Sequence, residues 1–367
     1  MTKLHDLYQE QGQSVWIDYI RRQFILDGGL QAAVDEGVRG VTSNPAIFEK
    51  AIAHSDDYDE QIQQLVKAGK TVEEIYEALA IEDIQGAADI LRPIYDESDG
   101  IDGYVSLEVN PTLANDTDGT IAEARDLHKK VNRPNVMIKV PATQAGIPAI
   151  KTLIGDGINV NVTLMFSLQD YDNVAGAYLD GLEILAGNDG DLSKVASVAS
   201  FFVSRVESDM DDAIEAAGNH DLLGKIAVAN TRLAYKRFQE WFSGTRWEAL
   251  AAKGARVQRP LWASTSVKND AYPDTKYVDD LIGPDTVNTM PPETKEAFKD
   301  HGTVARTIDI DVEQAQADVD QLAEIGVDYD AITQNLQDVG VDKFEKPFAS
   351  LMDSIRQKSE KLAQGAS

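Results

Sequence analysis

The chain has 367 residues, of which 43% are hydrophobic and 26% are charged, as is typical of a soluble globular protein. Its 34 basic and 62 acidic residues leave a formal net charge of −28, which repels nucleic acid and anionic membranes, so we expect neither as a partner. Cysteine is absent, which excludes disulfides, thiol catalysis and thiolate metal ligands. Residues 1–13 are polar and no apolar run reaches the length of a membrane span, so we expect a cytoplasmic protein.

Eight short runs rich in apolar and β-forming residues recur along the chain and are predicted to be strands. They lie at 14–19, 39–43, 103–109, 135–140, 159–166, 195–203, 259–265 and 285–290. Segments with helical spacing lie between them, at 58–69, 71–92, 119–131, 168–186 and 225–243. The second of these segments opens with Thr71 and Glu74 at the spacing of a capping box.

The alternation of strands and helices predicts a parallel sheet, and about eight such units predict an α/β fold of the (β/α)8 TIM-barrel type. A doubly wound open sheet is the alternative, although no glycine-rich phosphate loop follows the first strand. We expect residues 1–367 to form one domain, with 311–367 as a C-terminal helical extension that packs on the barrel or covers its mouth. The amphipathic spacing of this extension comes from Phe344, Phe348, Leu351, Met352 and Ile355.

Polar residues stand at the carboxyl ends of the predicted strands, where a parallel barrel builds its active site. Each has an ordinary explanation by itself. Asn44 before Pro45 suits a turn, and Glu108 can be the ion-pair partner of Lys139. Together the polar residues predict a sugar-binding pocket that contains Asp18, Asn44, Glu108, Lys139, Asn161, Thr163, Ser200, Arg205, Ser266 and Lys268.

Lys139 interrupts the apolar run from Asn135 to Pro141. Because a buried ammonium is costly to desolvate, this side chain either reaches water or an acid, or serves as an amine that attacks a carbonyl to form a Schiff base. Two nearby carboxylates would move the protons of such a reaction. Arg205 and Lys268 would suit a phosphate, the first as a planar fork and the second as a point charge.

The sequence shows no sign of a metal centre. None of the five histidines ends a predicted strand, and the H-E-x-x-H spacing of zinc enzymes is absent. P-loop and kinase motifs are absent too. These observations weigh against a metal-dependent aldolase or hydrolase.

Six segments of the chain resemble the transaldolase family. Residues 40–48 resemble its first signature, and residues 135–143 with Gly146 resemble its second, which contains the Schiff-base lysine. The other four similar segments are 106–109, 157–164, 199–205 and 259–266. Each segment is modestly specific, but the ordered set extends from Trp16 to about Thr294 and is typical of the family.

The resemblance implies a class I aldolase-type barrel that uses no metal and no organic cofactor. The implied reaction transfers a dihydroxyacetone unit from sedoheptulose 7-phosphate to glyceraldehyde 3-phosphate, giving erythrose 4-phosphate and fructose 6-phosphate. By position, Lys139 would form the Schiff base and Asp18 would take the proton of the C4 hydroxyl. Glu108 would assist dehydration of the carbinolamine with a water held by Thr163. Asn44, Asn161 and Ser200 would bind the hydroxyls of the dihydroxyacetone unit, and Arg205 would bind the phosphate, with Lys268 as a weaker phosphate assignment. Ser266 is a further substrate-binding candidate.

Two positions depart from the family pattern. Lys268 stands where the shorter transaldolases have an arginine, and a lysine cannot make the same bidentate contact. Asn110 follows the third predicted strand where a serine is expected. The length of the chain points to the longer bacterial-type subgroup.

Two alternative functions remain open. An aldolase could use the same imine but release free dihydroxyacetone or its phosphate, because the two reactions differ only in what intercepts the enamine. A sugar-phosphate-binding protein could keep the barrel without catalysis, since a fold does not determine a function. The sequence is equally compatible with a monomer and a homodimer.

Overall fold

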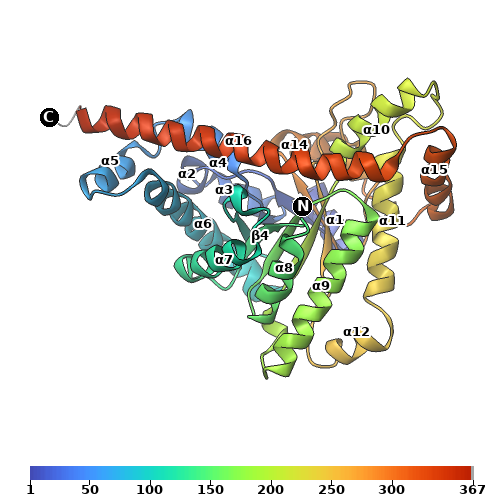
Figure 1. The fold of residues 1–367 in the computed structure, drawn as a ribbon, viewed down its shortest axis with the longest axis horizontal. Helices are drawn as coiled ribbons and strands as arrows, with labels where there is room; N and C mark the ends of the chain where they lie inside the picture. Colours follow the sequence, from blue (N-terminus) through green and yellow to red (C-terminus); the bar gives the residue numbers. More distant parts are fainter. Residues whose placement is uncertain (365–367) are drawn as a thin grey trace.

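The protein is a closed barrel of parallel strands surrounded by helices, in a computed structural model that describes residues 1–364 (Figure 1). Consecutive strands are hydrogen-bonded neighbours, and the eighth closes on the first. The strands are β1 Gln13–Ile17, β2 Val38–Val41, β3 Val105–Glu108, β4 Val136–Pro141, β5 Val160–Met165, β6 Ser197–Phe202, β7 Arg259–Ala263 and β8 Thr286–Met290. Every predicted strand is present to within two residues at each end, which confirms the TIM barrel and excludes the doubly wound sheet.

The strands are joined by helices that cover the outside of the barrel and by two short 3-10 helices. The α-helices of the described part are α1 Lys3–Gln11, α2 Arg22–Leu26, α3 Gly29–Asp35, α4 Pro45–Ala53, α5 Asp59–Lys67, α6 Val72–Glu97, α7 Thr117–Val131, α8 Gly146–Gly155, α9 Leu168–Gly187, α10 Ser204–Ala216, α11 Ile226–Trp241, α12 Gly244–Ala251, α13 Lys276–Asp279, α14 Pro292–His301, α15 Val312–Glu324 and α16 Tyr329–Gln364. The 3-10 helices are η1 Pro111–Leu113 and η2 Leu192–Lys194. Among the described residues, no helix combines the length and the apolar character needed to cross a bilayer.

The predicted capping box is present at the start of α6. The Thr71 hydroxyl accepts a hydrogen bond from the Glu74 N–H at 3.3 Å, and the Glu74 carboxylate accepts one from the Thr71 N–H at 2.9 Å. The helix itself is longer than predicted, because it continues through Pro93 to Glu97. Proline removes one hydrogen bond of the helix, but Leu91 and the partly buried residues beyond the proline keep this face of α6 on the core.

A buried cluster of charges closes the amino end of the barrel. Asp102 accepts hydrogen bonds from Arg39 at 2.9 Å, from Arg259 at 3.1 Å and from the Ser14 hydroxyl at 2.6 Å. Burial by itself favours the neutral acid, but the two guanidinium groups hold the pKa of Asp102 below its usual range. This end is therefore filled, and the space for a ligand lies at the carboxyl end.

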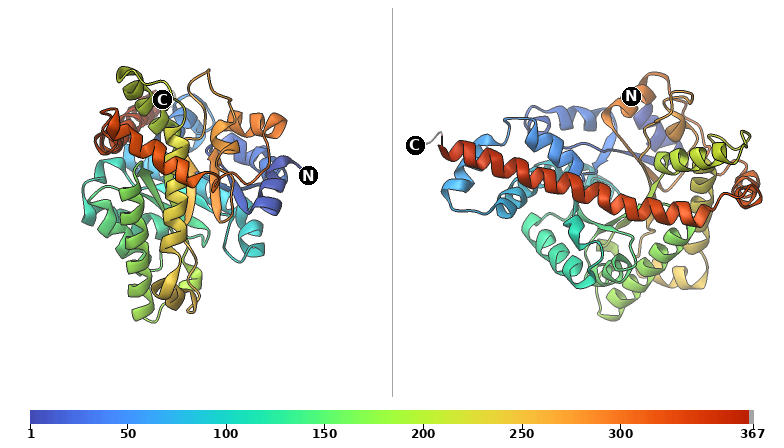
Figure 2. Two further views of the ribbon diagram at one scale, coloured as in Figure 1. Left: turned by 90° about the vertical axis from the view of Figure 1, so that its right-hand side faces the viewer. Right: turned by 45° about the horizontal axis from the view of Figure 1, so that its top comes forward.

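The predicted C-terminal helical segment is present as α15 and α16, and its last residues, 365–367, lie outside the described part. Helix α16 runs along the whole length of the molecule and crosses the carboxyl end of the barrel (Figures 1 and 2). Gln337 on α16 donates hydrogen bonds to the carbonyls of Ala142 at 3.1 Å and Leu164 at 3.2 Å. Further along the helix, Phe344 and Leu351 are buried. These contacts place one side of α16 directly over the ends of β4 and β5.

Candidate active site

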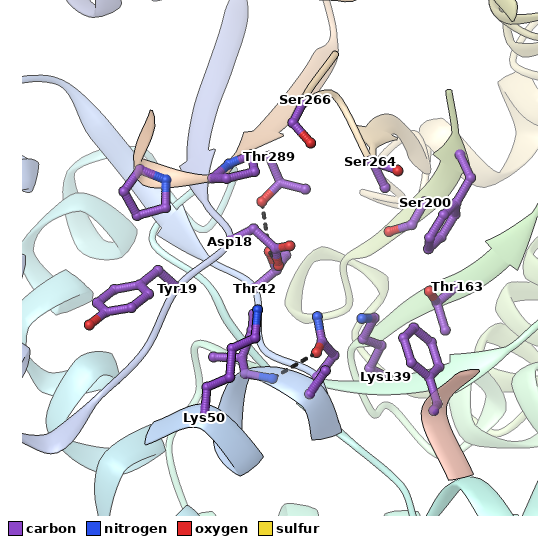
Figure 3. Close-up of a pocket in the computed structure, with 18 of the residues that line it drawn as sticks. Asp18, Tyr19, Thr42, Lys50, Lys139, Thr163, Ser200, Ser264, Ser266 and Thr289 are labelled. Atoms are coloured by element: carbon purple, nitrogen blue, oxygen red, sulfur yellow. Dashed lines mark hydrogen bonds between the residues drawn. The ribbon is translucent and has the colours of Figure 1, made fainter. Parts of the chain in front are cut away.

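A cavity of about 560 Å³ opens at the carboxyl ends of the strands (Figure 3). Eight of the ten predicted site residues line it: Asp18, Asn44, Lys139, Thr163, Ser200, Arg205, Ser266 and Lys268. The other two, Glu108 and Asn161, are buried and contact residues that line the cavity. Strand order and register bring together residues that are as much as 250 positions apart in the chain.

Lys139 lies in the wall of this cavity and is only 5% exposed. The register of the barrel aligns Glu108 on β3 with Lys139 on β4 and Lys139 with Asn161 on β5. Lys139 Nζ is 3.2 Å from Glu108 Oε2 and donates a hydrogen bond of 3.2 Å to the carbonyl of Ser43. The ring of Phe344 lies on another side of Nζ, 5.4 Å away at its centroid. The lysine is thus held by one acid, one carbonyl and one aromatic face.

Two carboxylic acids share this environment, and both hold their protons more strongly than usual. Burial raises the pKa of Glu108, and the charge of Lys139 only partly opposes this effect. Burial also raises the pKa of Asp18, against the opposing effects of Lys139 and of a 2.7 Å hydrogen bond donated by the Thr42 hydroxyl. Perturbed acids around a buried amine are typical of sites that transfer protons.

Neutral polar groups form one side of the cavity. Ser200 donates a 2.7 Å hydrogen bond to Asn161 Oδ1, and Asn161 Nδ2 donates one of 2.9 Å to Ser106. The hydroxyl of Thr163 is buried and has no hydrogen-bond partner among the described residues. Figure 3 shows Thr163 and Ser200 on the same side as Lys139, with Asp18 across from them. An unpartnered buried hydroxyl at this place can bind a water or a substrate oxygen.

Asn44 caps the turn that begins α4, as its ordinary explanation predicts, and it also lines the cavity. Its Oδ1 caps α4 by accepting a 3.0 Å hydrogen bond from the Ile47 N–H. The side-chain NH2 group takes no part in this cap, so it can donate to a ligand. The ordinary explanation and the functional one are therefore compatible at this position.

Two basic residues of the predicted set, Arg205 and Lys268, also line the cavity. Arg205 lies in the first turn of α10, and its Nη1 atom is buried without a partner in the described part of the chain. Ser266 and Lys268 lie in the segment after β7, and Lys268 Nζ donates a 2.6 Å hydrogen bond to the Ser266 hydroxyl. A guanidinium and an ammonium that face one cavity suit an anion such as a phosphate.

Several residues of the cavity wall were not predicted. Tyr19, Lys50, Phe202, Glu293 and Phe344 all line it. Phe344 was predicted only as part of the apolar face of the C-terminal helix, and no local sequence signal places that helix over β4. Asn110, unexplained in the sequence, caps η1 by accepting a 3.0 Å hydrogen bond from the Thr112 N–H, so its role is that of a turn residue.

Comparison with known proteins identifies the family of the chain. The family model described as transaldolase/fructose-6-phosphate aldolase matches residues 15–355. The chain belongs to this family. It is 46% identical over 365 residues to a transaldolase of Trichodesmium erythraeum, covering 96% of each chain. It is also 49% identical over 354 residues to a transaldolase of Acidothermus cellulolyticus, covering 95% of each.

A third relative, transaldolase 2 of Streptomyces avermitilis, is 48% identical over 368 residues, with 99% of each chain covered. The match extends through α16, so the helix that covers the site lies within the aligned length of these relatives. The resemblance inferred from the sequence is thus confirmed, and the chain is an enzyme of the transaldolase class.

Proposed function

We propose that this protein is a transaldolase that forms a Schiff base between Lys139 and its ketose substrate. The observation that carries the proposal is the buried Lys139 amine, 3.2 Å from the Glu108 carboxylate and facing the same cavity as Asp18. The proposed donor is sedoheptulose 7-phosphate and the proposed acceptor is glyceraldehyde 3-phosphate. The products are erythrose 4-phosphate and fructose 6-phosphate.

The first half of the reaction forms the imine. Glu108, whose pKa burial raises, takes a proton from Lys139, and the neutral amine attacks the C2 carbonyl of the ketose. The carbinolamine then loses water, with protons passing through Glu108 and a water held by the Thr163 hydroxyl. The unpartnered state of Thr163 Oγ1 among the described residues supports this role.

The second half breaks and remakes a C–C bond. Asp18 accepts the proton of the C4 hydroxyl as the C3–C4 bond breaks, so the aldose leaves and the electron pair of the bond enters the enamine on Lys139. The second aldose then enters, and its carbonyl carbon accepts the enamine electrons while Asp18 returns the proton. Hydrolysis of the new imine releases the product ketose and the free lysine.

The rest of the cavity orients the sugar. We propose that Asn44 and Ser200 bind the hydroxyls of the dihydroxyacetone unit, with Asn161 holding Ser200 in place through their 2.7 Å hydrogen bond. The phosphate is bound by Arg205, Ser266 and Lys268. Lys268 serves as a point charge and not as a planar fork, because its ammonium has no fixed plane.

The second candidate function is a fructose 6-phosphate aldolase, because the matching family model covers both activities. Supplying fructose 6-phosphate with and without erythrose 4-phosphate separates the two. We expect sedoheptulose 7-phosphate to form with the acceptor and little dihydroxyacetone to appear without it. Rapid release of dihydroxyacetone without the acceptor would establish the aldolase instead.

Borohydride trapping tests the covalent step directly. Reduction in the presence of fructose 6-phosphate should leave a three-carbon adduct on the peptide that contains Lys139, as measured by peptide mass spectrometry. Lys139→Ala should lose both the adduct and turnover, by about 10⁴-fold or more, because covalent catalysis then has no nucleophile.

Lys295→Ala is the matched control for this experiment. Lys295 is also buried and pairs with Glu36 at 2.7 Å, but it does not line the cavity. This variant should keep the adduct and the turnover. An adduct on another lysine, or turnover retained by folded Lys139→Ala, would contradict the Schiff-base mechanism.

A further inference from the structure

The segment between β7 and α13 carries Ser266 and Lys268 but contains no helix or strand, although all of it lies in the described part of the chain. Its start is tied to α10, because the Ser204 N–H donates a 2.9 Å hydrogen bond to the carbonyl of Ser264 and the two serine hydroxyls are 2.8 Å apart. Lys268 itself is exposed and forms no ion pair among the described residues. Its position must therefore be set by what holds the rest of the segment.

Near the other end of the segment, Tyr272 forms a second hydrogen-bonded contact, or tie, with α10. Its hydroxyl donates a 2.7 Å hydrogen bond to Asp211 Oδ2, and Asp211 lies nearly two turns along α10 from Arg205. The other carboxylate oxygen, Asp211 Oδ1, accepts a 2.9 Å hydrogen bond from the Gly224 N–H. Burial and the nearby Asp211 raise the pKa of Tyr272, so its hydroxyl stays protonated and remains a donor at neutral pH.

The surroundings of Tyr272 are shaped to receive its ring. Gly224 has a φ of +70°, and a Cβ at this position would lie 2.7 Å from two ring atoms of Tyr272, so only glycine allows the close approach. Glu207 on α10 supports the next part of the chain by accepting a 3.3 Å hydrogen bond from the Tyr277 hydroxyl. A cavity of about 160 Å³ borders Tyr272, Asp211 and Lys268 together.

We propose that Tyr272 and Asp211 are positioning residues that hold Lys268 and Ser266 opposite Arg205 and so determine the affinity of the site for the substrate phosphate. The inference rests on the proposed function. Arg205 and Asp211 belong to one rigid helix, whereas Ser266 and Lys268 lie between two ties of the segment to that same helix. Loss of the second tie lets the segment move, and a flexible lysine then loses more entropy when it meets the phosphate.

The test is Tyr272→Phe, which removes the hydroxyl and keeps the ring. We expect the KM for fructose 6-phosphate, with erythrose 4-phosphate as acceptor, to rise about fivefold to tenfold, which is less than the full effect of a lost hydrogen bond to a charged group because Tyr272 acts on the phosphate only through the segment. We expect kcat to change by less than about twofold, because the chemistry at Lys139 is untouched. The inhibition constant of inorganic phosphate should rise by the same factor as KM, whereas kcat/KM for unphosphorylated fructose should not change.

Tyr178→Phe is the matched control, because Tyr178 also donates one hydrogen bond, 2.8 Å to the Arg256 carbonyl, before β7 and away from the cavity. It should leave KM and the phosphate inhibition constant unchanged. Asp211→Asn combined with Tyr272→Phe should raise KM little beyond Tyr272→Phe alone, because both act through one hydrogen bond.

Two outcomes would overturn the inference: an unchanged phosphate inhibition constant in Tyr272→Phe, or equal losses with fructose 6-phosphate and with fructose. These outcomes are distinct from failure of the proposed function, which would appear as a wild-type protein that forms no borohydride adduct on Lys139. Thermal unfolding of each variant separates a change in the site from a change in overall stability.

Discussion

At the scale of single residues, the active site depends on burying charges that prefer water. Lys139 and Glu108 are 5% and 8% exposed, and removal of two ions from water costs several kcal/mol for each before their attraction offsets it. Lys139 Nζ and Glu108 Oε2 form an ion pair at 3.2 Å. Asp18, which lines the same cavity, has no cation within ion-pair distance among the described residues. The raised pKa values of both acids reflect this cost, and they supply the proton acceptors that the proposed mechanism uses.

These pKa shifts predict the pH dependence of turnover. Asp18 must be ionised to accept a proton, and because its pKa is raised by burial, kcat should fall as the pH drops through a value above the ordinary carboxyl range. Thr42→Val should move this acid limb still higher, because the Thr42 hydroxyl donates to Asp18 and stabilises its charged form. The measurement is kcat against pH for both proteins.

The control for this experiment is Thr120→Val, because the Thr120 hydroxyl donates to the carbonyl of Leu113 and, in the described part of the chain, to no carboxylate. Its acid limb should coincide with that of the wild type. An acid limb near the usual pKa of aspartate, or the same limb in Thr42→Val as in the wild type, would contradict the assignment of Asp18.

At the scale of elements, α16 completes a site that the barrel alone leaves open. Gly340 lies against Leu164 at the end of β5, where a Cβ would come within 3.0 Å of the leucine side chain. One turn further along the helix, Phe344 places its ring 5.4 Å from Lys139 Nζ and 5.9 Å from the Arg205 guanidinium. An aromatic face so placed attracts both cations and keeps water from the Lys139 amine.

Phe344→Ala should therefore change both the rate of transfer and the ratio of transfer to dihydroxyacetone release. We expect kcat/KM for transfer to fall about tenfold and the fraction of enamine released as dihydroxyacetone to rise, because water reaches the imine more easily. Folding stability should fall by about 3 kcal/mol from the loss of a buried ring. The measurements are product analysis with and without an acceptor, and chemical unfolding.

Phe348→Ala serves as the comparison on the same helix. Phe348 packs edge-on against Tyr76, with ring centroids 5.4 Å apart, and does not line the cavity. It should lower stability but keep the ratio of transfer to release. Equal ratios in the two variants would show that Phe344 only supports the fold.

At the scale of the whole molecule, the net charge of −28 opposes both folding and the approach of the proposed phosphorylated substrate. Some of the acidic groups form exposed ion pairs, such as Arg92 with Asp96 and Arg246 with Glu183, but such pairs contribute little, about 0–1 kcal/mol each, and leave the net charge unchanged. The cations of the cavity, Arg205 and Lys268, therefore act against a repulsive background. In the proposed complex their local attraction exceeds the repulsion, because both would contact the substrate phosphate directly.

This balance predicts a stabilising effect of salt. As NaCl rises from about 0.01 M to about 0.15 M, the screening length falls from roughly 30 Å to roughly 8 Å, which weakens the repulsion between distant acidic groups. We expect the free energy of unfolding to increase over this range, by about 1 kcal/mol or more, measured by urea unfolding at each salt concentration. Urea is suitable because it adds no ions. A free energy that falls with salt would show that attractive ion pairs outweigh the repulsion.

The order of the elements, and most of the predicted residues that line the cavity, follow from local patterns in the sequence. Strand ends in a parallel barrel converge whatever their loops contain, so a polar residue at the end of each apolar run, such as Lys139 or Ser200, is assigned to one cavity by its place in the chain alone. The strands and the capping box at Thr71 can be predicted from the sequence because each depends only on residues that are neighbours in the chain.

The contacts between side chains depend on how the elements pack. The 3.2 Å pair of Lys139 and Glu108, the ring of Phe344 over the lysine and the tie from Tyr272 to Asp211 all depend on contacts between distant segments. An amphipathic pattern predicts that a helix buries one face but not which surface it covers. For that reason the sequence predicted Phe344 as a core residue, and the packing of α16 across the barrel made it part of the site.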